Sequence, residues 1–249
     1  MTIRTFGWLP DHPDQRDFVF LSSVKAKIAA PPLVDLRGGC PSVYDQGSIG
    51  SCTAQAICAM VDFVRKKKKK PFITPSTLFL YYNERVMERT VNSDSGAMIR
   101  DGIKSVAKQG VPPSVEWPYD ELNVFKRPKK SAYDKALLFQ TLSYLRVNSR
   151  SLTQLRGCLA EGFPFVFGAT LYEKFETSKK GVIAMPGEHE DMIGGHAMLC
   201  VGYDDSRKVF IVRNSWGNKW GDKGYCYMPY DYLTNTSLSD DFWTIRDVE

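Results

Sequence analysis

The sequence has no long hydrophobic run and no leader-like N-terminus. No window of about 18 consecutive apolar residues occurs in the 249-residue chain, which excludes a membrane-spanning helix. The first residues, MTIRTFGWLPDHPDQRDF, lack the apolar stretch of a secretory signal because charged residues interrupt them. We therefore expect a soluble protein without a membrane partner. It would be cytoplasmic, exported by a non-classical route, or packaged in a virion if its source is viral.

Metal-ligand spacing is also absent. The six cysteines stand at positions 40, 52, 58, 158, 200 and 226, and no CxxC or Cys/His cluster has zinc spacing. No motif for calcium, zinc or an organic cofactor is present, so we expect no cofactor. Six cysteines in a chain of this length without a signal peptide are weak evidence for disulfides, and their pairing stays open. Most are expected to be small buried apolar residues.

The charge balance is mild, with 33 basic and 28 acidic residues and a net charge of +5. Much of the excess lies in one run, Arg65–Lys70 (RKKKKK). Such a run is a candidate site for an anionic partner, but it is more often a solvated loop or a frayed helix end. No aromatic residue interleaves with the lysines, which argues against base stacking.

The two halves of the chain differ in pattern. Ser51 is a candidate N-cap for an amphipathic helix that has Cys52 in its first turn, and further helices are expected over 76–89 and 98–108, before a Pro-rich loop over 111–130. The second half predicts strands over 142–147, 163–171, 197–203, 209–213 and 225–229, with a short helix over 152–160. Helices followed by turn-bounded strands predict an α+β protein of two lobes, with an antiparallel sheet or barrel in the second and a cleft between them.

Four residues suggest nucleophilic catalysis. Cys52 follows a glycine-rich turn at a helix start, where unpaired N–H groups and the helix dipole stabilise a thiolate. His196, one of three histidines, opens an apolar strand and is a candidate base. Asn214 could accept the His196 Nδ1–H and fix the ring, and Gln46 offers an amide donor for an oxyanion. Each alone is more often structural, but together, in this order and context, a purely structural interpretation becomes improbable.

The surrounding motifs resemble the papain/cathepsin family of cysteine peptidases, in a divergent microbial or viral form. The matching stretches are DQGSIGSCTA (45–54), GHAMLCVGY (195–203) and FIVRNSWGNKWGDKGY (210–225), with VDLR (34–37) like the start of the family's mature domain and WPY (117–119) like a family loop. The resemblance covers about residues 32 to 249. The interval from Cys52 to His196 is also within the range of about 130–150 residues expected for this arrangement.

The resemblance implies a role for each matching residue. Cys52 would be the nucleophile, His196 its acid/base partner, Asn214 the residue that orients the imidazole, and Gln46 the oxyanion-hole amide. Substrate-binding positions would be Gly50, Ser51, Gly96, Gly195, Trp216 and Trp220, with Trp216 packed over the His–Asn pair. The implied fold is a papain-like helical lobe and an antiparallel β-barrel-like lobe, with the active-site cleft between them.

Two positions depart from the family pattern. Ile49 stands where the family usually has a half-cystine, and no cysteine lies between residues 59 and 157, so the family's usual bridge cannot form. Thr53 replaces the usual tryptophan after the nucleophile. The main specificity subsite is expected near Ile99, Ala169 and Ala197, which would favour an apolar or aromatic side chain one position upstream of the scissile residue.

Residues 1–31 form an N-terminal extension to the peptidase domain (32–249), whose helical lobe is expected over about 32–130 and β lobe over about 131–249. The extension carries large apolar groups such as Phe6, Trp8 and Phe20, too many for a solvated tail. One interpretation is a short propeptide-like segment that covers the cleft. The other is that it only covers the back of the domain.

The functional expectation is a papain-like endopeptidase, a zymogen and a monomer, acting on peptides or proteins through a thioester. A non-catalytic papain-fold module that binds peptides or scaffolds a partner is the main alternative. A transglutaminase or amidase with the same thiolate chemistry is a third, which the NSWG…WG context disfavours.

Overall fold

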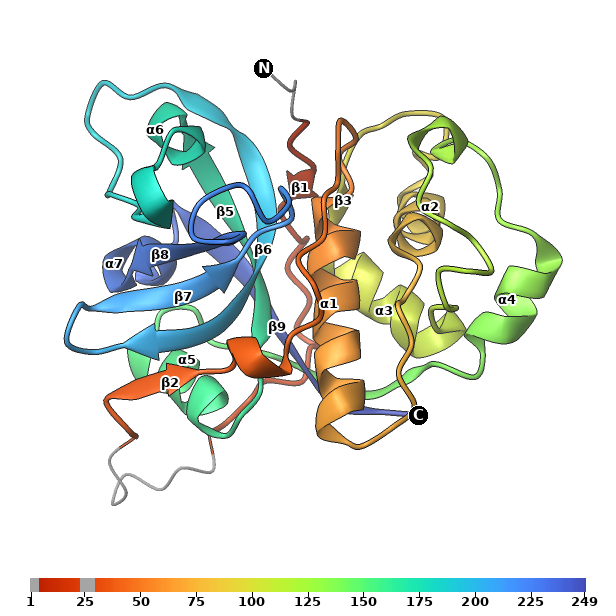
Figure 1. Ribbon diagram of the computed structural model, residues 1–249, viewed down its shortest axis with the longest axis horizontal. Helices are drawn as coiled ribbons and strands as arrows, with labels where there is room; N and C mark the ends of the chain where they lie inside the picture. Colours follow the sequence, from red (N-terminus) through yellow and green to blue (C-terminus); the bar gives the residue numbers. More distant parts are fainter. Residues whose placement is uncertain (1–4, 23–29) are drawn as a thin grey trace.

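The computed structural model describes residues 5–22 and 30–249. It has a helical lobe and a β lobe that meet along a seam (Figure 1). The helical lobe contains α1 (Cys52–Lys67), α2 (Thr77–Glu88), α3 (Ile99–Gln109) and α4 (Lys130–Ala136), together with the two-residue strand β3 (Ala97–Met98). The α+β, two-lobe prediction is confirmed.

The β lobe is built on one antiparallel sheet in the order β4–β9–β5–β6–β7–β8. Its strands are β4 (Thr141–Arg146), β5 (Phe165–Tyr172), β6 (Met192–Asp204), β7 (Val209–Arg213), β8 (Tyr225–Pro229) and β9 (Ser239–Val248). The helices α5 (Leu152–Ala160), α6 (Glu173–Glu176) and α7 (Tyr230–Thr234) accompany it. The described strands run from β4 to β8 without closing, so the lobe is an open curved sheet and not a closed barrel.

The lobe boundary differs from the expected one at the N-terminal side. Strand β2 (Leu33–Asp35) pairs antiparallel with β6, so the chain enters the peptidase domain through the β lobe before it crosses to α1. Leu36 continues this contact by donating its N–H to the Val201 carbonyl at 2.8 Å. Residues 33–36 therefore belong to the β lobe and not to a helical lobe starting at residue 32.

Helix α1 is the central element of the molecule. The sequence predicts an amphipathic helix, but every residue from Cys52 to Arg65 is buried. The reason is tertiary: α1 packs against β6 on one side and against α2 and α3 on the other, within one hydrophobic cluster shared by both lobes. A second cluster fills the interior of the β lobe behind the sheet. The start of α1 is thereby fixed against both lobes.

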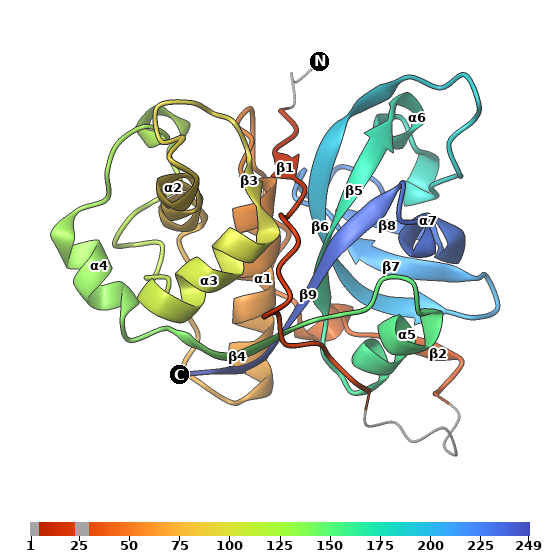
Figure 2. The same cartoon turned by 180° about the vertical axis from the view of Figure 1, so that it is seen from behind.

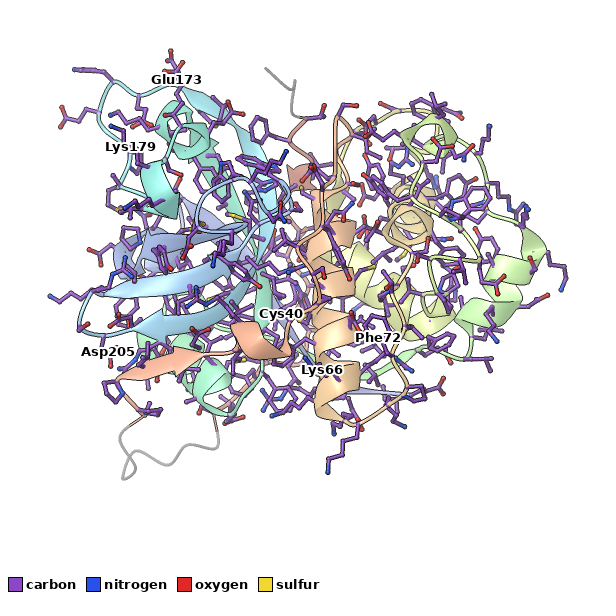
Figure 3. The ribbon with its side chains drawn as sticks, viewed as in Figure 1. Cys40, Lys66, Phe72, Glu173, Lys179 and Asp205 are labelled. Atoms are coloured by element: carbon purple, nitrogen blue, oxygen red, sulfur yellow. The ribbon has the colours of Figure 1, made fainter. Side chains whose placement is uncertain are left out.

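The basic run lies at the end of α1 away from Cys52, where Figure 3 labels Lys66. Arg65 donates to the carbonyl oxygens of Glu249 and Pro71, and Lys66 Nζ donates to Gly38 O at 3.0 Å. Lys68 pairs with Asp247 at 3.1 Å. The first residues of the run thus tie α1 to other parts of this chain, which favours a structural use for them.

Candidate active site

Cys52 is the first residue of α1 and is completely buried. The chain reaches it through the turn at Gly47, whose φ of +61° is a left-handed conformation that suits glycine. Ser51 stands at the predicted N-cap position, but its side chain makes no cap hydrogen bond and lies 2.8 Å from the Tyr119 hydroxyl. The first turn of α1 is therefore held by packing and not by a side-chain cap.

The surroundings of Cys52 favour the protonated thiol over the thiolate in this structure. Burial raises its pKa to about 12, and hydrogen bonds from the Ala197 and Gly7 amides only partly counter that effect. The Ala197 N–H lies 3.4 Å from Sγ, which places the sulfur beside the residue that follows His196. A helix N-terminus alone thus does not produce a thiolate here, because the site is shut off from water.

His196 and Asn214 form a buried pair. His196 lies on β6 opposite Ala169 of β5, and Asn214 directly follows β7. Their closest atoms are His196 Nε2 and Asn214 Oδ1, 2.7 Å apart. The expectation that Nδ1–H makes this contact was wrong. Because the two ring nitrogens point to opposite sides, the observed geometry assigns Nε2 to the asparagine and leaves Nδ1 for the other side of the ring.

Trp216 packs against the imidazole. Its ring centroid lies 5.0 Å from that of His196 with an interplanar angle of 36°. Trp220 meets Trp216 edge-on at 5.1 Å and stacks on Phe175, with its indole N–H donated to Glu176 O. Trp216 therefore packs on the imidazole, whereas Trp220 packs against Trp216.

Gln46 joins the two lobes beside Cys52. Its main-chain N–H donates to Ser215 O at 2.9 Å, and its side-chain oxygen accepts from Ser215 Oγ at 2.7 Å. These bonds orient the amide so that Nε2 donates to the carbonyl oxygens of Thr5 at 3.2 Å and Ile49 at 3.1 Å. The donor predicted for an oxyanion is thus already aimed at a peptide carbonyl, that of the N-terminal extension.

The described part of the extension runs along the seam between the lobes (Figure 2). Phe6 packs edge-on against His196, with centroids 6.1 Å apart, and against Trp216 at 6.2 Å. Strand β1 (Trp8–Leu9) pairs in parallel with β3, and the Ala97 N–H donates to Gly7 O at 2.7 Å. Residues 5–9 therefore lie on the catalytic-type residues, whereas the later part of the extension leaves them, with Asp17 against Arg100 and Val19 beside Arg146.

Three of the predicted substrate-binding glycines contact this segment. A Cβ at Gly96 would lie 2.3 Å from Gly7 O, one at Gly195 would lie 2.5 Å from Trp8 O, and Gly50 meets Gly7 backbone to backbone. The absence of side chains at these positions is what lets a second main chain approach so closely. Ser51 does not share this contact, because its hydroxyl faces Tyr119.

Sequence reasoning missed two acidic residues at the seam. Asp241 is buried and accepts hydrogen bonds from Trp8 Nε1 at 3.1 Å and Asp11 N at 2.7 Å. Asp11 in turn accepts from Trp243 Nε1 at 2.9 Å and from the Arg100 N–H at 3.0 Å. Neither aspartate belongs to a recognisable motif. The two carboxylates come close together only because the N-terminal extension packs against β9, near the other end of the sequence.

The expected specificity subsite is only partly assembled. Trp8, Ile99 and Ala197 belong to one hydrophobic cluster, but Ala169 lies in the other. Side chains alternate along a strand, and the neighbouring position, Gly168, is the one that faces Trp8. Ala169 therefore points into the β lobe and was wrongly placed in this subsite.

The described residues contain no group of three or more His, Cys, Asp or Glu side chains placed to hold a metal ion. All six cysteines are free thiols. A cavity of about 420 Å³ lies away from His196, lined by residues that include Tyr44, Pro75, Val115 and Tyr119. In the described part of the chain, no helix is both long and apolar enough to cross a membrane.

A family model described as "Papain family cysteine protease" matches residues 30–242 of the chain. The chain belongs to the papain family of cysteine proteases. Family members elsewhere include chymopapain of Carica papaya, 31% identical over 86% of this chain and 58% of its own length. This papain-family chain is accordingly a cysteine-type peptidase by family, fold and named relatives.

Two further relatives are similar over nearly the whole chain. An uncharacterized peptidase C1-like protein of Acanthamoeba polyphaga mimivirus is 38% identical, over 98% of this chain and 88% of its own length. The crystal structure of xylellain, a cysteine protease from Xylella fastidiosa, has a TM-score of 0.93 at 43% identity and covers 100% of this chain and 98% of that one. The fold extends to proCathepsin B S9 from Trypanosoma congolense, with a TM-score of 0.77 at 15% identity.

Proposed function

We propose that this papain-family protease is an endopeptidase that uses Cys52 as nucleophile and His196 as its acid/base partner. The observation that carries the proposal is the hydrogen bond of the predicted oxyanion donor: Gln46 Nε2 donates to the Thr5 carbonyl, and Cys52 six residues further along is buried. A donor that binds a peptide carbonyl in this way supports a role for Gln46 in stabilising the oxygen of a tetrahedral intermediate. Asn214 Oδ1, 2.7 Å from His196 Nε2, would hold the ring so that proton transfer takes place at Nδ1, on the other side of the imidazole.

The proposed reaction has two halves. His196 accepts the proton of the Cys52 thiol, the sulfur attacks the substrate carbonyl carbon, and the negative charge that forms on oxygen is stabilised by Gln46 Nε2 and the Cys52 N–H at the start of α1. His196 donates this proton to the leaving amine, and the C–N bond breaks to give a thioester. His196 then accepts a proton from water as the water attacks the thioester, the C–S bond breaks to release the acid, and His196 returns the proton to the Cys52 sulfur.

We also propose that the described form is the closed form of a zymogen. Main-chain pairing of β1 with β3 and the contacts of Phe6 with His196 and Trp216 exclude a substrate from the same place. Strand β1 of the extension runs parallel to β3. In this form burial also raises the pKa of the Cys52 thiol to about 12. Opening of the seam would let water and substrate reach Cys52, and its pKa would fall towards a reactive range.

The experiment is hydrolysis of a dipeptidyl fluorogenic amide under reducing conditions from pH 4 to 8. Turnover that disappears in Cys52→Ala, with stoichiometric labelling of Cys52 by a vinyl sulfone in the parent chain, is the expected result. A substrate that is still cleaved by Cys52→Ala would contradict the assignment of the nucleophile. Peptide binding without turnover or labelling, even after removal of residues 1–30, would instead favour the non-catalytic binding module.

The basic run remains a second, weaker candidate for function. Arg65, Lys66 and Lys68 make hydrogen bonds or ion pairs within the chain, and Lys67 lies over the Phe163 ring, so an anionic partner would have to rely mainly on Lys69 and Lys70. Replacing these two lysines with glutamine and measuring the salt dependence of nucleic-acid binding tests this. An unchanged slope would exclude the run as the binding site.

A further inference from the structure

Thr53, the second residue of α1, donates a hydrogen bond to a carboxyl of α2. Its hydroxyl oxygen lies 2.8 Å from Glu84 Oε2, and both residues are fully buried. Thr53 is also the position at which this chain departs from the tryptophan that usually follows the nucleophile. A side chain as short as threonine lets the Glu84 carboxyl approach the start of α1, and we call the two residues the Thr53–Glu84 pair.

The Glu84 carboxyl is enclosed where α1, α2 and α3 pack together. A Cβ at Gly102 of α3 would lie 2.3 Å from Glu84 Oε1 and 2.4 Å from Ile57 Cδ1 of α1. Only a residue without a side chain lets α3 come so close to the carboxyl. Oε1 has no hydrogen-bond partner in the described part of the chain, so the contact of Oε2 with Thr53 is the polar contact that orients this group.

A carboxyl in these surroundings keeps its proton. Burial raises the pKa of Glu84 well above its usual value, and the charges of Glu88 and Asp101 raise it further. Arg85 counters this only in part, because its guanidinium donates to main-chain carbonyl oxygens and not to the carboxyl. The neutral form matters because a negative charge on Glu84 would oppose the formation of a thiolate on Cys52.

The main chain of Thr53 faces the nucleophile. The Thr53 N–H contributes a hydrogen bond to the Cys52 sulfur, which lowers the pKa of the thiol. In many helices a side-chain cap fixes the amides of the first turn, but Ser51 makes no such bond here. A side-chain hydrogen bond from Thr53 to α2 can replace the cap, because it fixes the same turn from the other side.

We infer that Thr53 and Glu84 are positioning residues for the nucleophile. Glu84 fixes the first turn of α1 through the Thr53 hydroxyl, so that the Thr53 N–H stays directed at the sulfur when Cys52 becomes a thiolate. A donor held in this way stabilises the thiolate because it needs no reorientation as the charge forms. The inference rests on the proposed role of Cys52 and deepens it by naming two buried residues that act through the main chain.

The test measures the rate at which iodoacetamide alkylates Cys52 in the full chain from pH 4 to 9. Thr53→Val keeps the shape of the side chain but removes the hydroxyl. It should lower the rate about three- to tenfold at pH values where most of the thiol is protonated, as expected for the loss of one hydrogen bond. The deficit should shrink as pH rises, because the thiolate fraction then approaches one in both chains.

Each variant is compared with the parent chain at the same pH. Opening of the extension and titration of His196 then contribute equally to both rates, because the Thr53 hydroxyl bonds within the domain and not to the extension. Thr53→Ser returns the hydroxyl and should restore the parent rate to within about twofold. The matched control is Thr90→Val: the Thr90 hydroxyl, just after α2, is also buried but has no hydrogen-bond partner among the described residues. Its removal should leave the rate unchanged.

Glu84→Gln tests the other member of the pair. Glutamine keeps an acceptor for the Thr53 hydroxyl and is uncharged, so this variant should reproduce the parent pH profile. Alkylation about tenfold faster than in the parent at low pH would show that Glu84 is a charged group that opposes the thiolate, and would overturn the inference. A deficit in Thr53→Val that is equal at every pH, or that persists in Thr53→Ser, overturns it as well.

Hydrolysis of the dipeptidyl amide separates this inference from the peptidase proposal. In Thr53→Val its kcat/KM should fall by about the same factor as the alkylation rate, because acylation uses the same thiolate. If all variants hydrolyse the amide and alkylate at the parent rate, only the positioning role is refuted. If the parent chain neither hydrolyses the amide nor reacts at Cys52, the proposed peptidase function fails and the positioning role with it.

Discussion

The N-terminal extension is held in two different ways along its length. Residues 5–9, the proximal segment, contact the domain largely through main-chain atoms, such as Thr5 O on Gln46 and Gly7 O on the Ala97 N–H. Residues 11–20, the distal segment, are held by side chains: Asp17 pairs with Arg100 at 2.5 Å and Phe20 is buried in the β lobe.

The two segments therefore have different roles: the proximal segment blocks the site, and the distal segment anchors the extension to the domain. Main-chain pairing is available to any peptide, so the proximal segment can exclude a substrate but has little advantage over one, apart from the contacts of its Phe6 and Trp8 side chains. The distal contacts are particular to this sequence and are covalently tied to the proximal segment. They raise its effective concentration over Cys52, and the closed form therefore depends on both parts.

The largest effect is expected from Gly7→Ala in the proximal segment. A Cβ at Gly7 would lie 1.8 Å from Gly50 O and 2.8 Å from its Cα, and main-chain atoms cannot move aside as a side chain can. Overpacking of this kind costs about 3 kcal/mol or more at its upper end, which raises the open population by about a hundredfold or more. The second-order rate of Cys52 labelling by an uncharged peptidyl vinyl sulfone measures this directly.

The matched control is Gly38→Ala, because a Cβ there would meet nothing within 4 Å. It should leave the labelling rate unchanged. If Gly7→Ala reacts no faster than the Gly38→Ala chain, the proximal segment does not control access to Cys52.

A smaller but still large effect is expected from Asp17→Asn in the distal segment. The Asp17 and Arg100 side chains are only 8% and 6% exposed, so loss of the carboxylate leaves the guanidinium buried with weaker partners in the closed form alone. The labelling rate should rise about ten- to a hundredfold, as expected for the loss of a hydrogen bond to a charged group. An unchanged rate would mean that this pair stabilises the domain and not the closure.

Much of this architecture could be predicted from local patterns. The helix that begins with Cys52, and the strands that carry His196 and lead to Asn214, have clear periodicity and turn boundaries. Strand β9 was missed because its central residues Phe242 to Ile245 are all buried, so no polar–apolar alternation marks it. Helix α4 was missed because its seven residues follow a proline and bury only Ala132 and Ala136.

Local patterns could not predict the contacts by which the extension closes the site. The partners of Asp241 are residues 8, 11 and 146, separated from it by 95 to 233 positions, and no local pattern links them. The surroundings of Cys52 are likewise assembled from distant parts of the chain, because its sulfur accepts hydrogen bonds from the Ala197 and Gly7 amides. Sequence motifs identified the reacting groups, but not whether they are accessible.

The pH dependence of opening should be moderate and should favour the open form as pH rises. Burial raises the pKa of Asp241 to about 7, with the nearby Asp11 adding to the effect, and burial raises that of Asp11 as well. Arg146, Arg100 and Asp240 also face this pair. A carboxyl whose pKa is raised keeps its proton in the closed form and releases it on opening, so closure is favoured below about pH 7 and weakens as pH approaches that value.

Binding of an uncharged fluorescent peptide to the Cys52→Ala chain measures opening without interference from the thiol. Its apparent affinity should increase about tenfold between pH 5 and 7, the change expected for release of one proton over part of that range. In Asp241→Asn the profile should be nearly flat. An affinity that decreases with rising pH would show that the sign of this linkage is wrong.

The smallest effect is expected from Asp14→Asn. This variant compares the Asp14–Arg16 pair, whose arginine is exposed, with the buried Asp17–Arg100 pair of the same segment. Asp14 makes two hydrogen bonds to the Arg16 side chain, and its pKa is held well below the usual range chiefly by those bonds, but the Arg16 side chain is 88% exposed. Water replaces such a partner easily, so the labelling rate should change by less than about threefold. The same charge is removed as in Asp17→Asn, three residues further along. A rise equal to that of Asp17→Asn would mean that net charge on the extension controls closure, whereas a large difference between the two variants assigns the anchor to the buried Asp17–Arg100 pair.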